Sequence, residues 1–206
     1  MNDYYMNKKS YNKISKQWNE IRNKLPLNKC IIDFETKIKA KGKILDIGCG
    51  TGYPISKYFA DKGFLVTGID ISENMIEIAK NQNLPNAIFY CRDFFEFKPT
   101  EKYDAIIAFD SLFHFPKEKQ NEIYHIVSQW MNIGAYLLFT HGNKEGEITS
   151  YMYDEPFYYS SLNIYNVHKL LLDNDFVIES SIENYKELSC DRDLLIVAKK
   201  VKIQNK

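Results

Sequence analysis

Residues 43–70, KILDIGCGTGYPISKYFADKGFLVTGID, constrain this chain more than any other part of its sequence. The stretch opens with a short apolar run at residues 44–47, which has the length and the β-branched content of a buried parallel strand. Three glycines follow at every second position, Gly48, Gly50 and Gly52. Because glycine has no Cβ, the backbone can turn sharply there and a ligand can approach it closely. We therefore expect a binding loop directly after this strand.

The residues after the glycines complete a recognisable unit. Pro54 suits the first turn of a helix, where its missing N–H costs nothing, and Gly63 ends that helix. A second apolar run, residues 64–69, then leads to Asp70. A strand, a glycine loop, a helix, a strand and an acid follow one another in the order of a nucleotide-binding βαβ unit.

The glycine spacing separates two interpretations of this unit. A dinucleotide-binding loop needs G-x-G-x-x-G, whereas this chain has G-x-G-x-G preceded by Asp46. An acid at the mouth of the loop would repel a pyrophosphate and would suit an ammonium group. Asp70 is placed to accept hydrogen bonds from a ribose diol. A ribose and an ammonium without a phosphate describe S-adenosylmethionine. The alternative is a glycine turn in some other α/β domain.

The same residues resemble the first motif of the class I S-adenosylmethionine-dependent methyltransferases, an LD-G-G-G pattern with an acid at the end of the next strand. The resemblance covers residues 43–201. It implies a doubly wound α/β fold with a seven-stranded, mostly parallel sheet in the order 3-2-1-4-5-7-6. The last two strands, expected at residues 176–185 and 194–201, would close this sheet as an antiparallel hairpin. The resemblance also implies a set of cofactor-binding residues: Asp46, Gly48, Gly50, Gly52, Tyr53, Asp70, Asp93 and Phe94.

The other three candidate cofactor residues are predicted from their positions in the sequence. Ile71 and Met75 come just after the acid and can cover an adenine ring, although Met75 also suits an ordinary core. Asp110 follows a fully apolar strand expected at residues 105–109. In doubly wound sheets the ligand lies outside the carboxyl ends of the strands, and Asp110 shares that position with Asp46, Asp70 and Asp93. For Asp93 the alternative is a turn-forming aspartate.

The first 40 residues lie outside the resemblance. Residues 1–10 are polar, and we expect them to be mobile. An amphipathic helix is predicted over residues 11–24 and a shorter one over residues 29–38. In related methyltransferases such a segment folds over the cofactor and substrate, so we predict a helical lid at 1–40 before a domain at 41–206. Tyr11 and Trp18 are its candidate pocket residues, and the alternative is a helical layer packed on the sheet.

The acceptor side of the site is predicted from two histidines and one long segment. His114 and His141 follow the expected fourth and fifth strands, and His114 has the ordinary pKa of a general base. It can equally orient a substrate or hydrogen-bond within its loop. Residues 142–162 read as a long irregular segment rich in tyrosine, and long loops in compact domains are often functional. Glu147, Tyr158 and Tyr159 are therefore candidate acceptor-pocket residues, against the alternative of a packed surface loop.

Composition narrows the class of protein. The 206 residues are 45% hydrophobic, with 27 basic and 27 acidic side chains, so a full core is expected and a nucleic-acid partner is disfavoured. The amino terminus lacks the apolar core of a signal peptide, and no apolar run reaches the roughly 18 residues of a membrane span. The four scattered cysteines indicate reduced thiols in the cytoplasm rather than a disulfide frame. We expect a monomer or homodimer and no metal.

These observations together predict an enzyme that transfers a methyl group from S-adenosylmethionine to a small molecule. Residues 110–113 read Asp-Ser-Leu-Phe, where methyltransferases of nucleic-acid bases or glutamine amides carry an N/D-P-P-Y type motif. Carboxylate pairs with metal-ligand spacing are missing, which disfavours a divalent-metal catechol O-methyltransferase. Two alternatives remain from the residues alone, a non-catalytic S-adenosylmethionine-binding protein and an NAD-dependent oxidoreductase. The glycine spacing and Asp46 disfavour the second.

Overall fold

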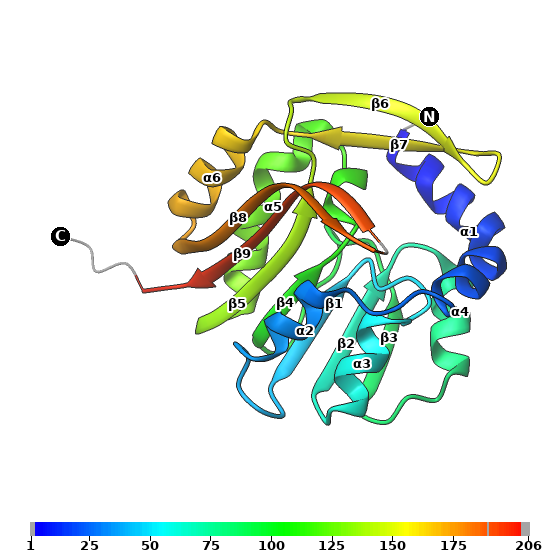
Figure 1. The fold of residues 1–206 in the computed structure, drawn as a ribbon, viewed down its shortest axis with the longest axis horizontal. Coiled ribbons are helices and arrows are strands. Elements are labelled where there is room, and N and C mark those ends of the chain that lie inside the picture. The colour runs from blue at the N-terminus through cyan, green and yellow to red at the C-terminus, as the bar shows by residue number, and fades with distance from the viewer. Residues whose placement is uncertain (1–2, 189, 203–206) are drawn as a thin grey trace.

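A seven-stranded sheet forms the centre of the computed structural model, which describes residues 3–188 and 190–202 (Figure 1). The strands are β1 (Lys43–Ile47), β2 (Leu65–Asp70), β3 (Ala87–Cys91), β4 (Tyr103–Ala108), β5 (Met131–His141), β8 (Phe176–Glu187) and β9 (Cys190–Lys200). Their order is β3-β2-β1-β4-β5-β9-β8. Strands β1 to β5 are parallel, while β9 is antiparallel to both of its neighbours. Numbered within this sheet alone, the order is 3-2-1-4-5-7-6, which confirms the predicted topology.

Helices cover both faces of this sheet because the central strands are apolar on both sides. On one face α2 (Lys29–Glu35) and α3 (Ile55–Asp61) bury Phe34 and Phe59 against Ile44 of β1. On the other face α5 (Gln120–Trp130) and α6 (Ile164–Asp173) contribute buried side chains to the hydrophobic cluster that contains Leu45. Helix α4 (Glu73–Asn81) lies beside β2 and β3, and the short 3-10 helices Leu112–His114 and Lys117–Lys119 join β4 to α5.

The glycine loop has the local geometry that its sequence predicts. Gly48, Gly50 and Gly52 have φ of 71°, 55° and 76°, values that side-chain-bearing residues rarely adopt. The N–H groups of Gly48 and Cys49 both donate to the carbonyl of Ile69, at 2.8 and 3.0 Å. These bonds fix the loop to the end of β2, beside Asp70.

The amino-terminal helix differs from the prediction. Helix α1 runs over Asp3–Arg22, so the expectation of a mobile segment at 1–10 is wrong for residues 3–10, and residues 1–2 lie outside the described part of the chain. The first half of α1 is fixed by polar side chains. Asn7 and Ser10 are each only 2% exposed, and both bond to strand β7. Apolar periodicity does not reveal a helix whose buried face carries polar side chains.

The sequence led us to expect an irregular segment at residues 142–162, but most of these residues form regular structure. They contain the antiparallel hairpin β6 (Gly146–Met152) and β7 (Glu155–Ser161), which is separate from the main sheet. Its two-residue turn places Tyr153 and Asp154 at φ of 53° and 63°, the pattern of a type I′ turn. The hairpin was missed because neither turn residue is glycine or asparagine, the strongest signals for this turn.

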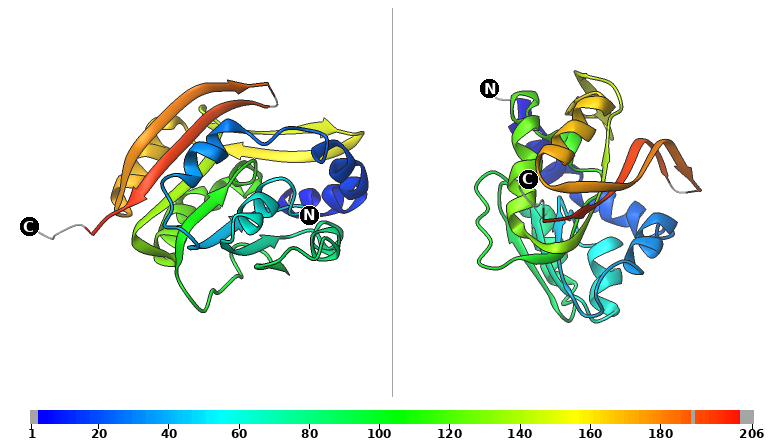
Figure 2. Two further views of the ribbon diagram at one scale, coloured as in Figure 1. Left: turned by 60° about the horizontal axis from the view of Figure 1, so that its bottom comes forward. Right: turned by 90° about the vertical axis from the view of Figure 1, so that its left-hand side faces the viewer.

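Residues 186–193, between the last two expected strands, are also mostly strand. Pairing of β8 with β9 continues outward to Glu187 opposite Cys190. The long hairpin bends away from the rest of the sheet, and the β6–β7 hairpin lies beside α1 on the same side as the glycine loop (Figures 1 and 2). In the described part of the chain, no helix combines the length and apolar character needed to cross a bilayer.

Candidate functional site

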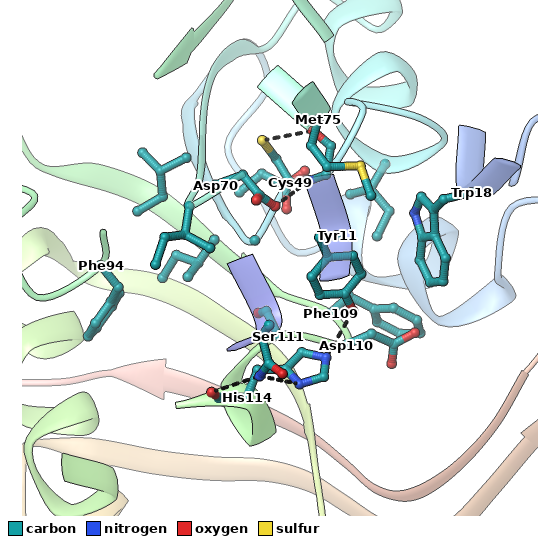
Figure 3. Close-up of a pocket in the computed structure, with 18 of the residues that line it drawn as sticks. Tyr11, Trp18, Cys49, Asp70, Met75, Phe94, Phe109, Asp110, Ser111 and His114 are labelled. Atoms are coloured by element: carbon teal, nitrogen blue, oxygen red, sulfur yellow. Dashed lines mark hydrogen bonds between the residues drawn. The ribbon is translucent and has the colours of Figure 1, made fainter. Parts of the chain in front are cut away.

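A cavity lies at the carboxyl ends of β1, β2 and β4, where doubly wound sheets bind ligands (Figure 3). Side chains of α1 form one part of its wall. Most of the predicted cofactor residues line it: Asp46, Gly48, Gly50, Tyr53, Asp70, Ile71, Met75, Phe94 and Asp110. The two predicted lid residues, Tyr11 and Trp18, line it as well, together with His114.

Asp70 is fixed as an acceptor at the floor of this cavity. Its Oδ2 accepts from the N–H of Gly50 at 2.9 Å, and its Oδ1 accepts from the N–H of Ser72 at 2.8 Å. Burial raises the pKa of this carboxyl, while the two backbone donors oppose that shift. Each oxygen retains a second lone pair, so Asp70 can accept further bonds from a diol.

Asp46 lies deeper in the cavity wall. It is 3% exposed, and its carboxyl accepts a 2.6 Å hydrogen bond from the hydroxyl of Ser56. Burial raises the pKa of Asp46 to about 7, against the opposing bond from Ser56. A cation beside Asp46 and Asp70 would favour their ionised forms.

Two predicted cofactor residues do not line the cavity. Gly52 faces the ring of Phe89, which a Cβ at Gly52 would meet at 3.0 Å, so this glycine lets the loop pack against β3. The carboxylate of Asp93 accepts from the N–H of Phe95 at 2.9 Å, as in the turn-forming alternative. Cofactor binding by Asp93 stays a prediction, while its neighbour Phe94 is 3% exposed and lines the cavity.

Ser111 is a site residue that the sequence did not reveal. It is 6% exposed and lines the cavity, and its hydroxyl has no hydrogen-bond partner among the described residues. It lies against the glycine loop, since a Cβ at Gly48 would be 2.4 Å from the Ser111 Cβ. A buried hydroxyl without a partner carries a free-energy cost that a ligand can remove.

The lid residues Tyr11 and Trp18 project from α1 over the cavity (Figure 3). The Tyr11 hydroxyl lies 2.9 Å from Nε2 of His114, and its ring meets the ring of Trp18 edge-on with centroids 5.9 Å apart. Asn7, one helical turn before Tyr11, was not predicted and also lines the cavity. No motif marks Asn7, because its role depends on a strand distant in sequence.

The contacts of His114 favour one tautomer. Its Nδ1 lies 2.9 Å from the carbonyl of Tyr158, which can only accept, and 3.1 Å from the amide nitrogen of Asn7, which can only donate. Because the Asn7 amide also donates to the Tyr158 carbonyl at 2.9 Å, and the contact of Nδ1 with that carbonyl is the shorter of its two, we infer that Nδ1 carries the proton. The bare Nε2 then accepts from the Tyr11 hydroxyl. Burial lowers the pKa of His114 to about 4, so the ring is neutral at neutral pH. His114, which was predicted as a base, is therefore a weak base. Its unprotonated Nε2 already has a hydrogen-bond partner in the Tyr11 hydroxyl.

A second cavity of about 740 Å³ lies next to the first, between the β6–β7 hairpin and the ends of β5 and β9. Four of the residues predicted on the acceptor side line it: His114, His141, Glu147 and Tyr159. Tyr158 does not. It is 6% exposed, and its hydroxyl donates to Glu147 at 2.8 Å, so it supports the wall. Tyr11, Trp18, Asp110 and His114 line both cavities and form the boundary between them.

His141 is buried at the inner end of this second cavity. Its Nδ1 lies 2.8 Å from the carbonyl of Gly142, and its Nε2 lies 3.1 Å from Oε1 of Gln120. Burial lowers the pKa of His141. Both ring nitrogens are thus occupied by protein groups, and the predicted catalytic role of His141 is untested.

Asp110 joins three elements by its carboxylate. Arg192 of β9 bonds to both oxygens, and Arg22, the last residue of α1, reaches Oδ2 at 3.2 Å. Thr140 donates to Oδ1 at 3.1 Å and accepts from the N–H of Asp110 at 2.7 Å. Neither arginine was predicted, because each is far from Asp110 in sequence.

Residues 44–134 match the model of a family described as methyltransferase domain. Among curated proteins, a ubiquinone biosynthesis O-methyltransferase of Coxiella burnetii is 39% identical over 88 residues, which are 40% of this chain and 37% of that protein. A malonyl-[acyl-carrier protein] O-methyltransferase of Bacillus cereus is 35% identical over 102 residues, 48% of this chain and 36% of that protein. The matched region is thus little more than a third of the length of these relatives.

Solved structures share the whole fold at low identity. A SAM-dependent methyltransferase of Methanosarcina mazei has a TM-score of 0.69 and 22% identity, over 86% of this chain and 99% of that one. A magnesium protoporphyrin IX methyltransferase of Synechocystis, solved with bound SAM, has a TM-score of 0.71 and 20% identity, over 97% and 98% of the two chains.

Proposed function

We propose that this chain, whose residues 44–134 match a methyltransferase-domain family, is a class I methyltransferase that uses S-adenosylmethionine to methylate a small-molecule acceptor. The observation that carries the proposal is the pairing of the glycine loop with Asp70. The Gly50 N–H holds one oxygen of a buried carboxylate at 2.9 Å, where that carboxylate can accept bonds from a ribose diol. Asp46, in β1 just before the loop, disfavours a phosphate.

The residues of the first cavity fit this cofactor along its length. Ile71, Met75 and Phe94 supply an apolar slot for an adenine, and Asp70 supplies the acceptor for a ribose. Asp46 and Asp70 suit the positive charges of an ammonium and a sulfonium, and the unpartnered Ser111 hydroxyl offers a further polar contact. When bound, S-adenosylmethionine supplies an electrophilic methyl group on its sulfonium sulfur.

We place the acceptor in the second cavity, with Glu147 and Tyr159 in its wall. Tyr11, Trp18, Asp110 and His114 line both cavities, so the methyl group would pass between their side chains. The task of these residues is to align the acceptor with the methyl group and to exclude water. The aromatic rings of Phe113 and Tyr159 favour a flat acceptor, and the equal numbers of acidic and basic side chains disfavour a nucleic acid.

The state of His114 bears on the mechanism. A pKa of about 4 makes its ring a weak base, and Tyr11 occupies its free nitrogen. We therefore infer that His114 and Tyr11 shape the boundary between the cavities, and that the acceptor is nucleophilic without prior loss of a proton to His114. We also infer that α1 is the lid predicted for residues 1–40.

Calorimetry with S-adenosylhomocysteine, the demethylated cofactor, tests the proposal. We expect micromolar binding by the wild type, no binding of NAD, and a loss of at least about tenfold in affinity, or 1.4 kcal/mol, in Asp70→Asn. Asp61→Asn, which changes an exposed carboxylate on α3, is the matched control and should bind normally. At a ligand concentration of 100 Kd, the stabilisation of about 2.7 kcal/mol should raise the Tm by roughly 5–10 °C.

Tighter binding of NAD than of S-adenosylhomocysteine would replace the proposal with the oxidoreductase alternative. Binding of the cofactor without turnover of S-adenosylmethionine on any acceptor would favour the non-catalytic alternative. Mass spectrometry of cell extracts incubated with the protein and methyl-labelled S-adenosylmethionine separates these cases, because a methylated product carries the label.

A further inference from the structure

We propose that Arg22 is the binding residue for the carboxylate of the amino-acid end of the cofactor, and that Asp110 holds this arginine in place until the cofactor arrives. The inference rests on the proposed function, because it assigns one subsite of the same cofactor. It gives α1 a direct contact with the ligand that it covers.

The first observation is an excess of positive charge at Asp110. Among the described residues, Asp110 is the only carboxylate within salt-bridge distance of Arg22 or of Arg192. The side chains of Arg22, Asp110 and Arg192 are only 16%, 13% and 23% exposed. Two guanidinium groups thus share one carboxylate in a partly buried place. Charges removed from water need partners, so the site can accept one more anion.

The second observation is that Arg22 is the weaker partner in this group. Arg192 contacts both oxygens of Asp110 with two of its nitrogens, the two-pronged geometry of a strong pair, and Thr140 adds another donor. Arg22 contributes one bond at 3.2 Å. If Arg22 turns to another anion, Asp110 keeps three hydrogen bonds from its side-chain neighbours. The exchange therefore leaves no buried carboxylate unpaired.

The third observation is the position of Arg22. It lines the first cavity, whereas Arg192 lines only the second. The guanidinium lies 4.8 Å from the centre of the Trp18 ring, and the indole nitrogen of Trp18 lies 3.8 Å from the Cβ position of Gly50. The Trp18 ring thus lies between Arg22 and the glycine loop. The other arginine of this cavity, Arg92, follows β3 near the proposed adenine slot.

Ser111 provides an independent sign of a ligand at this end of the cavity. Its buried hydroxyl lacks a partner among the described residues, lies beside Gly48, and follows Asp110 in the chain. Figure 3 shows Ser111 and Asp110 on the same side of the cavity. A hydroxyl and a guanidinium at one end form a donor pair suited to a carboxylate.

The test compares two ligands that differ only in the carboxylate. The first is S-adenosylhomocysteine, and the second is 5′-deoxy-5′-(3-aminopropylthio)adenosine, the same molecule without its carboxylate. We expect the wild type to prefer S-adenosylhomocysteine at least tenfold by calorimetry. Arg22→Gln should lose that preference, with an affinity for the decarboxylated ligand that stays within twofold of the wild type.

Lys16→Gln is the matched control, because it removes one positive charge from an exposed position of the same helix. It should keep the tenfold preference, which separates a direct contact from a general effect of charge. Binding of the decarboxylated ligand also reports that the cavity of Arg22→Gln is intact. If Arg22→Gln does not fold, Arg22→Lys serves instead, with a several-fold loss expected for S-adenosylhomocysteine alone.

Equal losses for both ligands in Arg22→Gln, or a wild type that does not distinguish them, would overturn this inference while leaving the proposed function standing. Failure of the wild type to bind either ligand would instead overturn the proposed function. The two failures therefore give different results in the same titration.

Discussion

Burial sets the ionisation of the side chains at this site more than residue type does. In water the pKa of an aspartate is near 4 and that of a histidine near 6.5. In the folded chain the pKa of Asp46 is raised to about 7, and the pKa of His114 is lowered to about 4. Burial is the largest cause in both cases, and it favours the neutral form of each group. A sequence reveals which groups can titrate, whereas their folded environment decides at which pH they do.

The raised pKa of Asp46 predicts a pH dependence of stability. Because the folded state holds the proton up to about pH 7 and the unfolded state releases it near pH 4, the free energy of unfolding should fall as pH rises through this window. Asp46→Asn removes the contribution. We therefore compare the unfolding free energies of Asp46→Asn and the wild type by urea denaturation at pH 4 and at pH 8. The difference, variant minus wild type, should be larger at pH 8 than at pH 4 by an amount on the order of 3 kcal/mol.

Asp61→Asn, at an exposed carboxylate, should show no such trend relative to the wild type. Asp70 is present in all three proteins, and its charge is one of the causes that raise the pKa of Asp46. A difference between Asp46→Asn and the wild type that is constant from pH 4 to pH 8 would contradict the prediction.

The tautomer and charge of His114 can be observed directly. We expect ¹⁵N NMR of the imidazole to show a neutral ring with the proton on Nδ1 at every pH from 8 down to 6, because Nδ1 faces the Tyr158 carbonyl and burial lowers the pKa to about 4. His114→Asn assigns the signal among the four histidines. Tyr11→Phe should keep the Nδ1 proton and shift only Nε2. An imidazolium at pH 6 would restore His114 as a candidate general base.

At the level of elements, α1 forms hydrogen bonds to both the cofactor side and the acceptor side of the site. Asn12 accepts from the Ser72 hydroxyl at the start of α4, on the cofactor side. Asn7 accepts from the N–H of Tyr158 at 2.7 Å and donates to its carbonyl at 2.9 Å, on the acceptor side. The Asn7 amide thus pairs with β7 as a neighbouring strand would. Both cavities share α1 as a wall, so its position affects both.

Asn7→Ala should loosen this contact without unfolding the domain. It leaves the buried Tyr158 N–H without its acceptor, at a cost of about 1–3 kcal/mol. We expect amide hydrogen exchange in β7 to accelerate by about 10–100-fold, while β1 and β4 keep their protection. Lys16→Ala, on the exposed face of the same helix, is the control and should leave β7 unchanged. Uniform acceleration across the sheet, or none in β7, would contradict this role.

At the level of the whole molecule, the main sheet followed from local patterns. Apolar runs at β1 and β4 predicted buried strands, and their bounds agree within about two residues with the structure. Ser72 is the N-cap of α4 and accepts from the N–H of Met75 at 3.2 Å. Such features depend on neighbours in sequence, which is why a single chain is enough to predict them.

The elements missed by the sequence analysis are those whose stability comes from distant partners. Residues 3–10 are helical because polar side chains meet the β6–β7 hairpin, and that hairpin is ordered partly by α1. Neither segment has a strong apolar period. Each therefore looks mobile or irregular when it is considered alone.

Local patterns alone predicted the doubly wound sheet, the glycine loop and the acids at the strand ends, because strand periodicity and glycine geometry are local properties of the backbone. The folded structure was needed to show that α1 lines the cavity and that Asp110 lies between Arg22 and Arg192. It likewise decided that the His114 ring is neutral and held by Tyr11. These features depend on contacts between residues about 80 to 110 positions apart, and on a burial that exists only once the chain has folded.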